Sequence, residues 1–147
     1  MDELGFRRID AREFQWLYEL VRDSFHDVVV RQLGNWDDDR ERALFDRKWR
    51  DDNCVRIVLL GNVRIGAVRQ EQRASYDWLD QILIAAEHRG KGYGTALVRS
   101  FVSDARARCR PLRLRVLHEN HRARHFYERL GFVEVEKLDN HCLMQAE

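Results

Sequence analysis

The sequence predicts a mixed α/β fold, in which helices cover a mixed sheet. Short β-rich segments alternate with segments of helical periodicity, a Gly-Asn pair separates two of the β-rich segments, and glycine-rich turns stand beside two of the helical ones. The chain has 147 residues, of which 44% are hydrophobic, and this is enough for one sizeable core. We therefore expect a single domain over residues 1–147.

Four segments carry the periodicity or the end signals of helices. The first begins at a capping box formed by Asp10 and Glu13, and the second follows the acidic run 37–39, whose charge suits a helix N-terminus. The third is expected over 92–108, and the fourth is a short helix that Asn120 caps and a glycine ends. The apolar residues expected on the second helix are Ala43, Leu44 and Trp49.

The remaining segments predict seven strands. Gly61-Asn62 supplies the two-residue turn of a hairpin, and apolar residues alternate with Arg113 and Arg115 in the manner of a strand. The expected strands are 4–9, 55–60, 63–68, 78–84, 112–116, 132–135 and 141–144. The resulting order is β-α-α-β-β-β-α-β-α-β-β.

Charge is unevenly distributed, although the net charge is only +1. Residues 89–124 hold 10 basic and 2 acidic residues, which favours a polyanionic ligand; a solvated basic surface is the other interpretation. Cys54, Cys109 and Cys142 have no metal-binding spacing and predict reduced thiols in a cytoplasmic protein. No apolar run reaches the roughly 20 residues that cross a bilayer, so we expect no membrane association.

Residues 89–94, which read Arg-Gly-Lys-Gly-Tyr-Gly, are the first informative segment. Glycines between a strand and a helix let the backbone curl until the N–H groups of the helix start converge on an anion. A plain strand-to-helix turn is the alternative. The string Gly-x-x-x-x-Gly-Lys-Ser/Thr of a P-loop is absent, and the glycines at 90, 92 and 94 do not have dinucleotide-fingerprint spacing.

Residues 120–132 are the second informative segment, with the pattern Asn-x-x-Ala-x-x-Phe-Tyr-x-x-x-Gly-Phe. Asn120 can cap the helix and offer an amide to a ligand, while Gly131 permits the positive φ that ends the helix. Ordinary core packing is the alternative for Phe126 and Tyr127.

The two segments, in this order, resemble the motifs of the GNAT superfamily of acyl-CoA N-acyltransferases. The first fits Arg/Gln-x-x-Gly-x-Gly/Ala, and a less specific likeness at Asn35-Trp36-Asp37 and 141–144 is similar to small bacterial members. The resemblance implies the GNAT fold, acetyl-CoA as cosubstrate and no metal. In this family a central strand pairs with pantetheine and diverges from the next strand. The residues so implied at the carrier are Ile82, Leu83, Ile84, Arg89, Gly90, Lys91, Gly92, Tyr93, Gly94, Thr95, Asn120, Phe126 and Tyr127.

The resemblance also implies acetyl transfer to a primary amine by direct attack in a ternary complex. Tyr127 stands where the family's general acid protonates the leaving thiolate, and a backbone N–H near Ile84 can stabilise the oxygen. Arg115 stands where members that acetylate protein N-termini often carry Glu, which argues against that specificity. The base is undefined: Asp80 is the candidate we retain, and a water chain is an alternative. Other nearby groups, each with a structural role as the alternative, are Asp77, His118, Glu119 and His141.

We expect the acceptor, a small-molecule or peptide amine, between the first two helices and the last strands. Trp36, Trp78 and His141 are the candidate acceptor contacts; further candidate lining residues are Tyr18, Phe25, His26 and Trp49. A non-catalytic acyl-CoA sensor or interaction module on the same fold is the second hypothesis, and a homodimer through late strands is compatible with the resemblance. Nucleic acid is not an expected partner, because the arginines of 106–124 alternate with apolar core residues rather than exposed aromatics.

Overall fold

The computed structural model describes residues 3–49 and 53–147. The strands are β1 (Leu4–Arg8), β2 (Val55–Leu60), β3 (Val63–Gln72), β4 (Asp77–Ile84), β5 (Leu112–Leu117), β6 (Val133–Lys137) and β7 (His141–Ala146). The helices are α1 (Phe14–Leu33), α2 (Asp38–Trp49), α3 (Tyr93–Ala107) and α4 (His121–Arg129), with single 3-10 turns η1 (Ala11–Glu13) and η2 (Ala86–His88). This order is the predicted one, so the expected mixed α/β class is confirmed.

One sheet holds all of these strands, in the order β1-β2-β3-β4-β5-β7-β6. Among the described strands, β4 and β5 are the parallel neighbours, and their pairing is confined to Asp77 with Leu112 and Trp78 with Arg113. Beyond Trp78 the two strands diverge, and β4 has no strand partner on that side. The expected divergence is therefore present, and it opens a wedge in the middle of the sheet.

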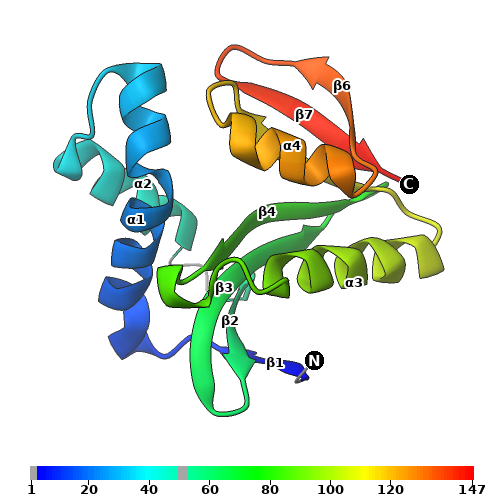
Figure 1. Cartoon of the computed structure of the whole chain (residues 1–147), viewed down its shortest axis with the longest axis horizontal. Coiled ribbons are helices and arrows are strands. Elements are labelled where there is room, and N and C mark those ends of the chain that lie inside the picture. The colour runs from blue at the N-terminus through cyan, green and yellow to red at the C-terminus, as the bar shows by residue number, and fades with distance from the viewer. Residues whose placement is uncertain (1–2, 50–52) are drawn as a thin grey trace.

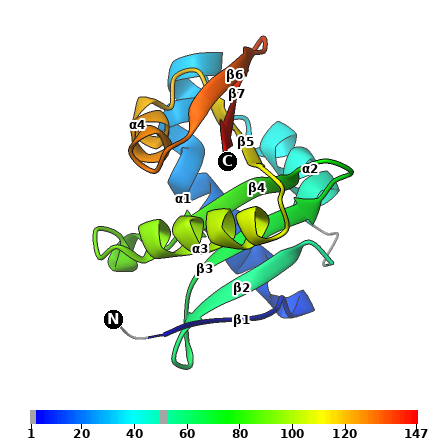
Figure 2. The ribbon, with the colours of Figure 1, turned by 90° about the vertical axis from the view of Figure 1, so that its right-hand side faces the viewer.

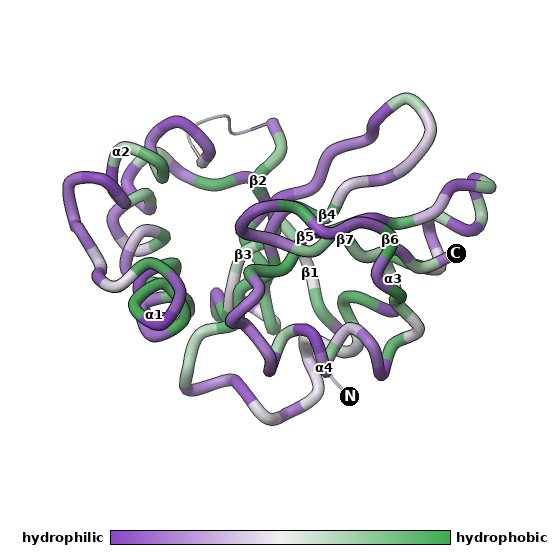
Figure 3. Tube along the Cα trace, turned by 90° about the horizontal axis from the view of Figure 1, so that it is seen from above, coloured by the Kyte–Doolittle hydropathy of each residue, from purple (hydrophilic) through white to green (hydrophobic). Residues whose placement is uncertain are grey.

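Helices cover both faces of the sheet: α1 and α2 lie on one face and α3 on the other (Figures 1 and 2). Two hydrophobic cores result, one beneath α3 and one beneath α1 and α2. The adjacent residues Ala67 and Val68 of β3 contribute to different cores, because successive side chains of a strand point to opposite faces. The central sheet is thus buried on both sides, and Figure 3 shows hydrophobic residues along its strands and hydrophilic ones in the outer loops.

Arginines hold the end of the sheet where β4 and β5 still pair. Asp77 of β4 is buried and accepts hydrogen bonds from Arg108 Nη1 at 3.2 Å and from Arg110 Nε at 3.0 Å. Its backbone N–H donates to the carbonyl of Pro111, just before β5. Asp77, a base candidate in the sequence, therefore anchors the narrow end of the wedge and lies outside the cleft described below.

A buried carboxylate ties the start of α1 to the sheet. Glu13 accepts hydrogen bonds from Arg7 of β1, at 2.6 and 2.8 Å, and from Arg64 of β3 at 2.9 Å. It also accepts the backbone N–H of Asp10, whose side chain caps η1, so the predicted capping box is present. The arginine Arg7 above all, together with these other bonds, lowers the pKa of Glu13 to about 2.

Close backbone approach between β3 and β4 requires a glycine. A Cβ placed on Gly66 would lie 2.0 Å from the carbonyl oxygen of Leu83, well inside contact distance. Because that oxygen belongs to the backbone, only a shift of one strand could relieve the clash. Gly66 therefore fixes the position of β4 against β3.

The second helix carries Ala43, Leu44 and Trp49 as predicted, but only Trp49 of these three is buried. Phe45 and Trp49 form its buried face, at 3% and 2% exposure, whereas Leu44 is 46% exposed. Cys142 is buried and Cys54 is partly buried. Within the described residues, no helix combines the length and apolar character needed to cross a membrane.

Candidate active site

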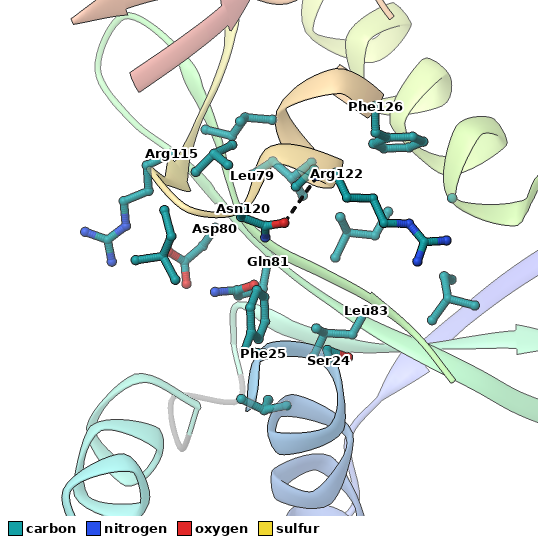
Figure 4. A pocket seen from close by; sticks show the side chains of 18 of the residues that line it. Ser24, Phe25, Leu79, Asp80, Gln81, Leu83, Arg115, Asn120, Arg122 and Phe126 are labelled. Carbon is teal, nitrogen blue, oxygen red and sulfur yellow. Dashed lines mark hydrogen bonds between the residues drawn. The ribbon is translucent and has the colours of Figure 1, made fainter. Parts of the chain in front are cut away.

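A cleft of about 1350 Å³ fills the wedge between β4 and β5. Its walls come from α1 and α2 on one side and from the start of α3 and from α4 on the other. The close-up in Figure 4 shows Asp80 and Arg115 toward one end of the cleft, with Arg122 and Phe126 toward the other. We call these two regions the acceptor end and the carrier end.

A glycine turn closes the carrier end at the start of α3. Gly90 and Gly92 have positive φ values of 74° and 86°, a conformation that favours glycine, and Gly92 is the N-cap residue of α3. Gly92 has no side chain with which to cap this helix, so the N–H groups of its first turn are left for solvent or a ligand. The helix dipole adds a partial positive charge there, so the turn is suited to a phosphate.

The side chain of Arg89 stabilises this turn from behind. Its Nε donates to the carbonyl of Ile84 at 2.7 Å, and its Nη2 donates to Ser24 of α1 at 3.1 Å. The turn is thereby tied both to the end of β4 and to α1. Its backbone, rather than this guanidinium, is left to contact a ligand.

Asn120 and Tyr127 belong to α4, which forms the opposite wall. Asn120 Oδ1 accepts the backbone N–H of Ala123 at 3.2 Å, so Asn120 caps α4 as predicted and keeps its amide nitrogen for other contacts (Figure 4). The ring of Tyr127 packs edge-on against Phe126 and Phe132, with centroids 5.1 and 5.4 Å away. Burial raises the pKa of the Tyr127 phenol, which therefore stays protonated at neutral pH.

Asp80 is the central group of the acceptor end. Its side chain is 4% exposed, and its Oδ2 lies 3.2 Å from Arg69 Nη1 and 3.5 Å from Lys48 Nζ. Trp78 Nε1 donates to its Oδ1 at 3.2 Å. Arg69 also donates from Nε to the carbonyl of Lys48 at 3.0 Å, which fastens the end of α2 to the sheet. Both oxygens of Asp80 are thus engaged by three donors from three elements.

Two further groups stand beside Asp80. Arg115 projects from β5 and lines the cleft (Figure 4). His141 of β7 lines it too, and desolvation, together with the charges of Arg115 and Lys48, lowers the pKa of its imidazole to about 4. The same desolvation lowers the pKa of Lys48. His141 is therefore neutral near pH 7.

The cleft gathers most, but not all, of the residues that the sequence singles out. The predicted residues that line it are Trp36, Asp80, Ile82, Leu83, Ile84, Arg89, Gly90, Gly92, Tyr93, Gly94, Thr95, Asn120, Phe126, Tyr127 and His141. Lys91 and Trp78 are not among its lining residues; Trp78 instead packs beside Tyr76 and beneath the guanidinium of Arg73. Tyr18, Phe25 and Trp49 line it as expected, and His26 does not.

Sequence reasoning missed three basic residues. Lys48 lies at the end of α2 and Arg69 in β3, where nothing in the local pattern indicates that both reach Asp80. Arg122 follows the cap of α4 and lines the carrier end (Figure 4). Its place within the predicted basic segment was the available signal.

The family model described as Acetyltransferase (GNAT) family matches residues 10–132. The chain belongs to this family of acyltransferases. No curated protein matches it at a significant level. Both segments that resemble GNAT motifs thus border one cleft of a GNAT protein.

Solved structures share the GNAT fold over almost the whole chain. The PaiA N-acetyltransferase of Thermoplasma acidophilum, in complex with coenzyme A, is 15% identical over 99% of both chains, with a TM-score of 0.76. An acetyltransferase of Thermus thermophilus is 18% identical over 99% of both chains, with a TM-score of 0.71. The spermidine N-acetyltransferase of Vibrio cholerae, in complex with CoA and spermine, is 22% identical over 97% of this GNAT chain and 94% of its own, with a TM-score of 0.64.

Proposed function

We propose that this GNAT protein is an N-acetyltransferase that transfers an acetyl group from acetyl-CoA to a primary amine. One observation carries the proposal: the glycine turn at the start of α3 and the protonated phenol of Tyr127 border the same cleft, which the divergence of β4 and β5 opens. The solved PaiA structure, which contains coenzyme A, has the same fold.

The residues of the carrier end fit an acyl-CoA. The uncapped first turn of α3 suits the pyrophosphate, and the open edge of β4 offers unpaired backbone groups to the amides of pantetheine. Arg122 adds a cation at the same end and has no ion-pair partner among the described residues. We assign the carrier to Ile82–Ile84, to the turn at 89–95 and to the cap of α4.

The carrier supplies an acyl group that is already activated as a thioester. Tyr127 holds a proton at its Oη and would give it to the departing sulfur. A backbone N–H on the open edge of β4, near Ile84, would donate to the acyl oxygen as charge develops there. Because the oxygens of Asp80 are already hydrogen-bonded, we propose that Asp80 takes the proton of the amine through a water molecule.

A non-catalytic acyl-CoA sensor is the second candidate, and one observation favours it. Within the part of the chain that the structure describes, the carboxylates that line the cleft are those of Glu41 and Asp80, and both are ion-paired. Arg40 lies 3.2 Å from Glu41, and Asp80 has the two cations described above. A cleft in which both described carboxylates are already paired could bind the carrier and yet leave an amine unactivated.

Calorimetric titration with acetyl-CoA, followed by a thiol-release assay over a panel of amines, separates these candidates. The matched variants are Gly90→Ala and Gly61→Ala, because both glycines have positive φ and open space around the missing Cβ. Each should cost about 1 kcal/mol of stability, but Gly90→Ala alone should weaken acetyl-CoA binding. Failure of the wild-type protein to bind millimolar acetyl-CoA rejects both candidates, and binding without turnover of any amine favours the sensor.

A further inference from the structure

Cations outnumber carboxylates among the described side chains that line the cleft. The cations that line the cleft are those of Arg47, Lys48, Arg89, Arg115, Arg122 and Arg129. The carboxylates are those of Glu41 and Asp80. A phosphorylated carrier accounts for cations at the carrier end, where the glycine turn and Arg122 lie. It does not account for those at the acceptor end, on the far side of Gln81 (Figure 4).

At the acceptor end, the positive charges of the described residues outnumber the negative ones. Asp80 is bracketed by Lys48 and Arg69, and Arg69 is shared with Glu71, which is itself 3.0 Å from Arg73. Every acidic group of this network therefore has two basic neighbours. Arg115 stands beside the network and adds another positive charge. Desolvation above all, and this charge in addition, lower the pKa values of His141 and Lys48.

Arg115 differs from the cations of this network in its lack of a partner among the described residues. Its guanidinium lines the cleft and has neither a hydrogen bond nor an ion pair within the described part of the chain. The neighbouring arginine of the same strand is different: Arg113 donates to Gln145 at 2.6 Å and lies 4.7 Å above the ring of Tyr76. A guanidinium presents paired N–H groups that match the two oxygens of a carboxylate.

The positive charge of the acceptor end would repel a cationic acceptor. A polyamine would bring further positive charge to a wall where the buried carboxylate already has two cationic partners, and Coulomb repulsion from Arg115 would oppose its binding. An acceptor that carries an anion would instead pair with Arg115 while its amine points toward the carrier. Phe25, Trp36 and Tyr18 complete the wall with aromatic surface for its apolar part.

We infer that the acceptor of this protein is an amino carboxylate, a primary amine whose carboxylate is bound by Arg115 at the acceptor end of the cleft. The inference rests on the proposed function and names the substrate class of that same site. It assigns Arg115 to substrate binding, and Lys48 and Arg69 to holding Asp80.

The test compares amino acids with their carboxamides, which keep the amine and lose the negative charge, and includes an aminoalkyl phosphonate and spermidine. Thiol release gives KM and kcat for each amine. For the amino acids, Arg115→Gln should raise KM by about tenfold or more, as the loss of one charge-assisted pair predicts, and leave kcat nearly unchanged. Arg115→Lys should restore part of the affinity. Arg113→Gln, an identical change on the same strand outside the cleft, should change neither constant.

A second measurement keeps the inference independent of turnover. The same amines are titrated into the protein saturated with CoA, and the amino acids should bind more tightly than their carboxamides in the wild type but not in Arg115→Gln. Equal binding of acid and amide, or a preference for spermidine or for the phosphonate, overturns the inference while leaving acetyl transfer intact. Loss of acetyl-CoA binding by the wild-type protein would instead defeat the proposed function.

Discussion

The carboxylate of Glu13 should make the stability of this protein fall in acid. Replacing Glu13 by Gln removes the negative charge that Arg7 and Arg64 share and keeps a side chain of nearly the same size. Glu19→Gln is the matched control, because Glu19 lies on the exposed face of α1 and its one hydrogen-bond donor among residues 3–49 and 53–147 is Gln15.

The size of the effect follows from the pKa of Glu13, which falls from 4.5 to about 2 on folding. At about 1.4 kcal/mol per unit, this corresponds to about 3.5 kcal/mol. Glu13 is 9% exposed, but Arg7 and Arg64 are 42% and 41% exposed, so solvent screening reduces the estimate to roughly 1–3 kcal/mol. A group whose folded pKa is lowered stabilises the protein above its unfolded pKa. This contribution is therefore complete above about pH 5 and is lost as the pH falls toward 2.

Urea unfolding of wild type, Glu13→Gln and Glu19→Gln, between pH 7 and pH 3, measures this contribution. The gap in unfolding free energy between wild type and Glu13→Gln should be widest at pH 7. By pH 3 it should shrink to about half or less. Glu19→Gln should follow the wild type throughout. A gap of the same size at pH 7 and pH 3 would refute the assignment of the stabilisation to the ionised carboxylate.

Two further substitutions test the acid and the sheet. Tyr127→Phe removes one hydroxyl and keeps the ring packing, so acetyl transfer should slow by about 10²–10⁴-fold while the affinity for acetyl-CoA, measured by calorimetry, is unchanged. Tyr76→Phe, outside the cleft, is the control. Unchanged turnover in Tyr127→Phe would remove Tyr127 from the mechanism. Gly66→Ala places a Cβ against the carbonyl of Leu83 and should lower the unfolding free energy by more than about 2 kcal/mol. Gly5→Ala, whose Cβ would have ordinary contacts, should cost much less, and equal costs in chemical denaturation would contradict the close approach of β3 and β4.

Local patterns predicted the fold well because each element carries its own signals. The alternation of β5, the cap at Asn120 and the capping box at Asp10 act over a few residues, and all three are present in the structure. The exposure of Leu44 was not predictable, because which face of α2 meets the sheet depends on distant residues.

The carrier end of the cleft was predictable for the same reason, since two contiguous motifs supply it. The acceptor end was predictable only in part. Asp80 and His141 were among the candidate residues and line the cleft, whereas Lys48 and Arg69 come from α2 and β3, and no spacing in the chain relates them to Asp80. Trp78 illustrates the same limit: it lies two residues from Asp80 and donates to it, yet it does not line the cleft.

The divergence of β4 and β5 also has a mechanical consequence. The four strands β1–β4 and the three strands β5–β7 are joined within the sheet by two residue pairs at one end, beside the anchor of Asp77. The sheet therefore has two parts, β1–β4 and β5–β7, that pair with each other only at this end, and the remaining edge of β4 has no described strand beside it. A bound ligand that hydrogen-bonds to this edge would take the place of a neighbouring strand. Amide protons in both parts of the sheet should therefore exchange more slowly in the complex than in the free protein.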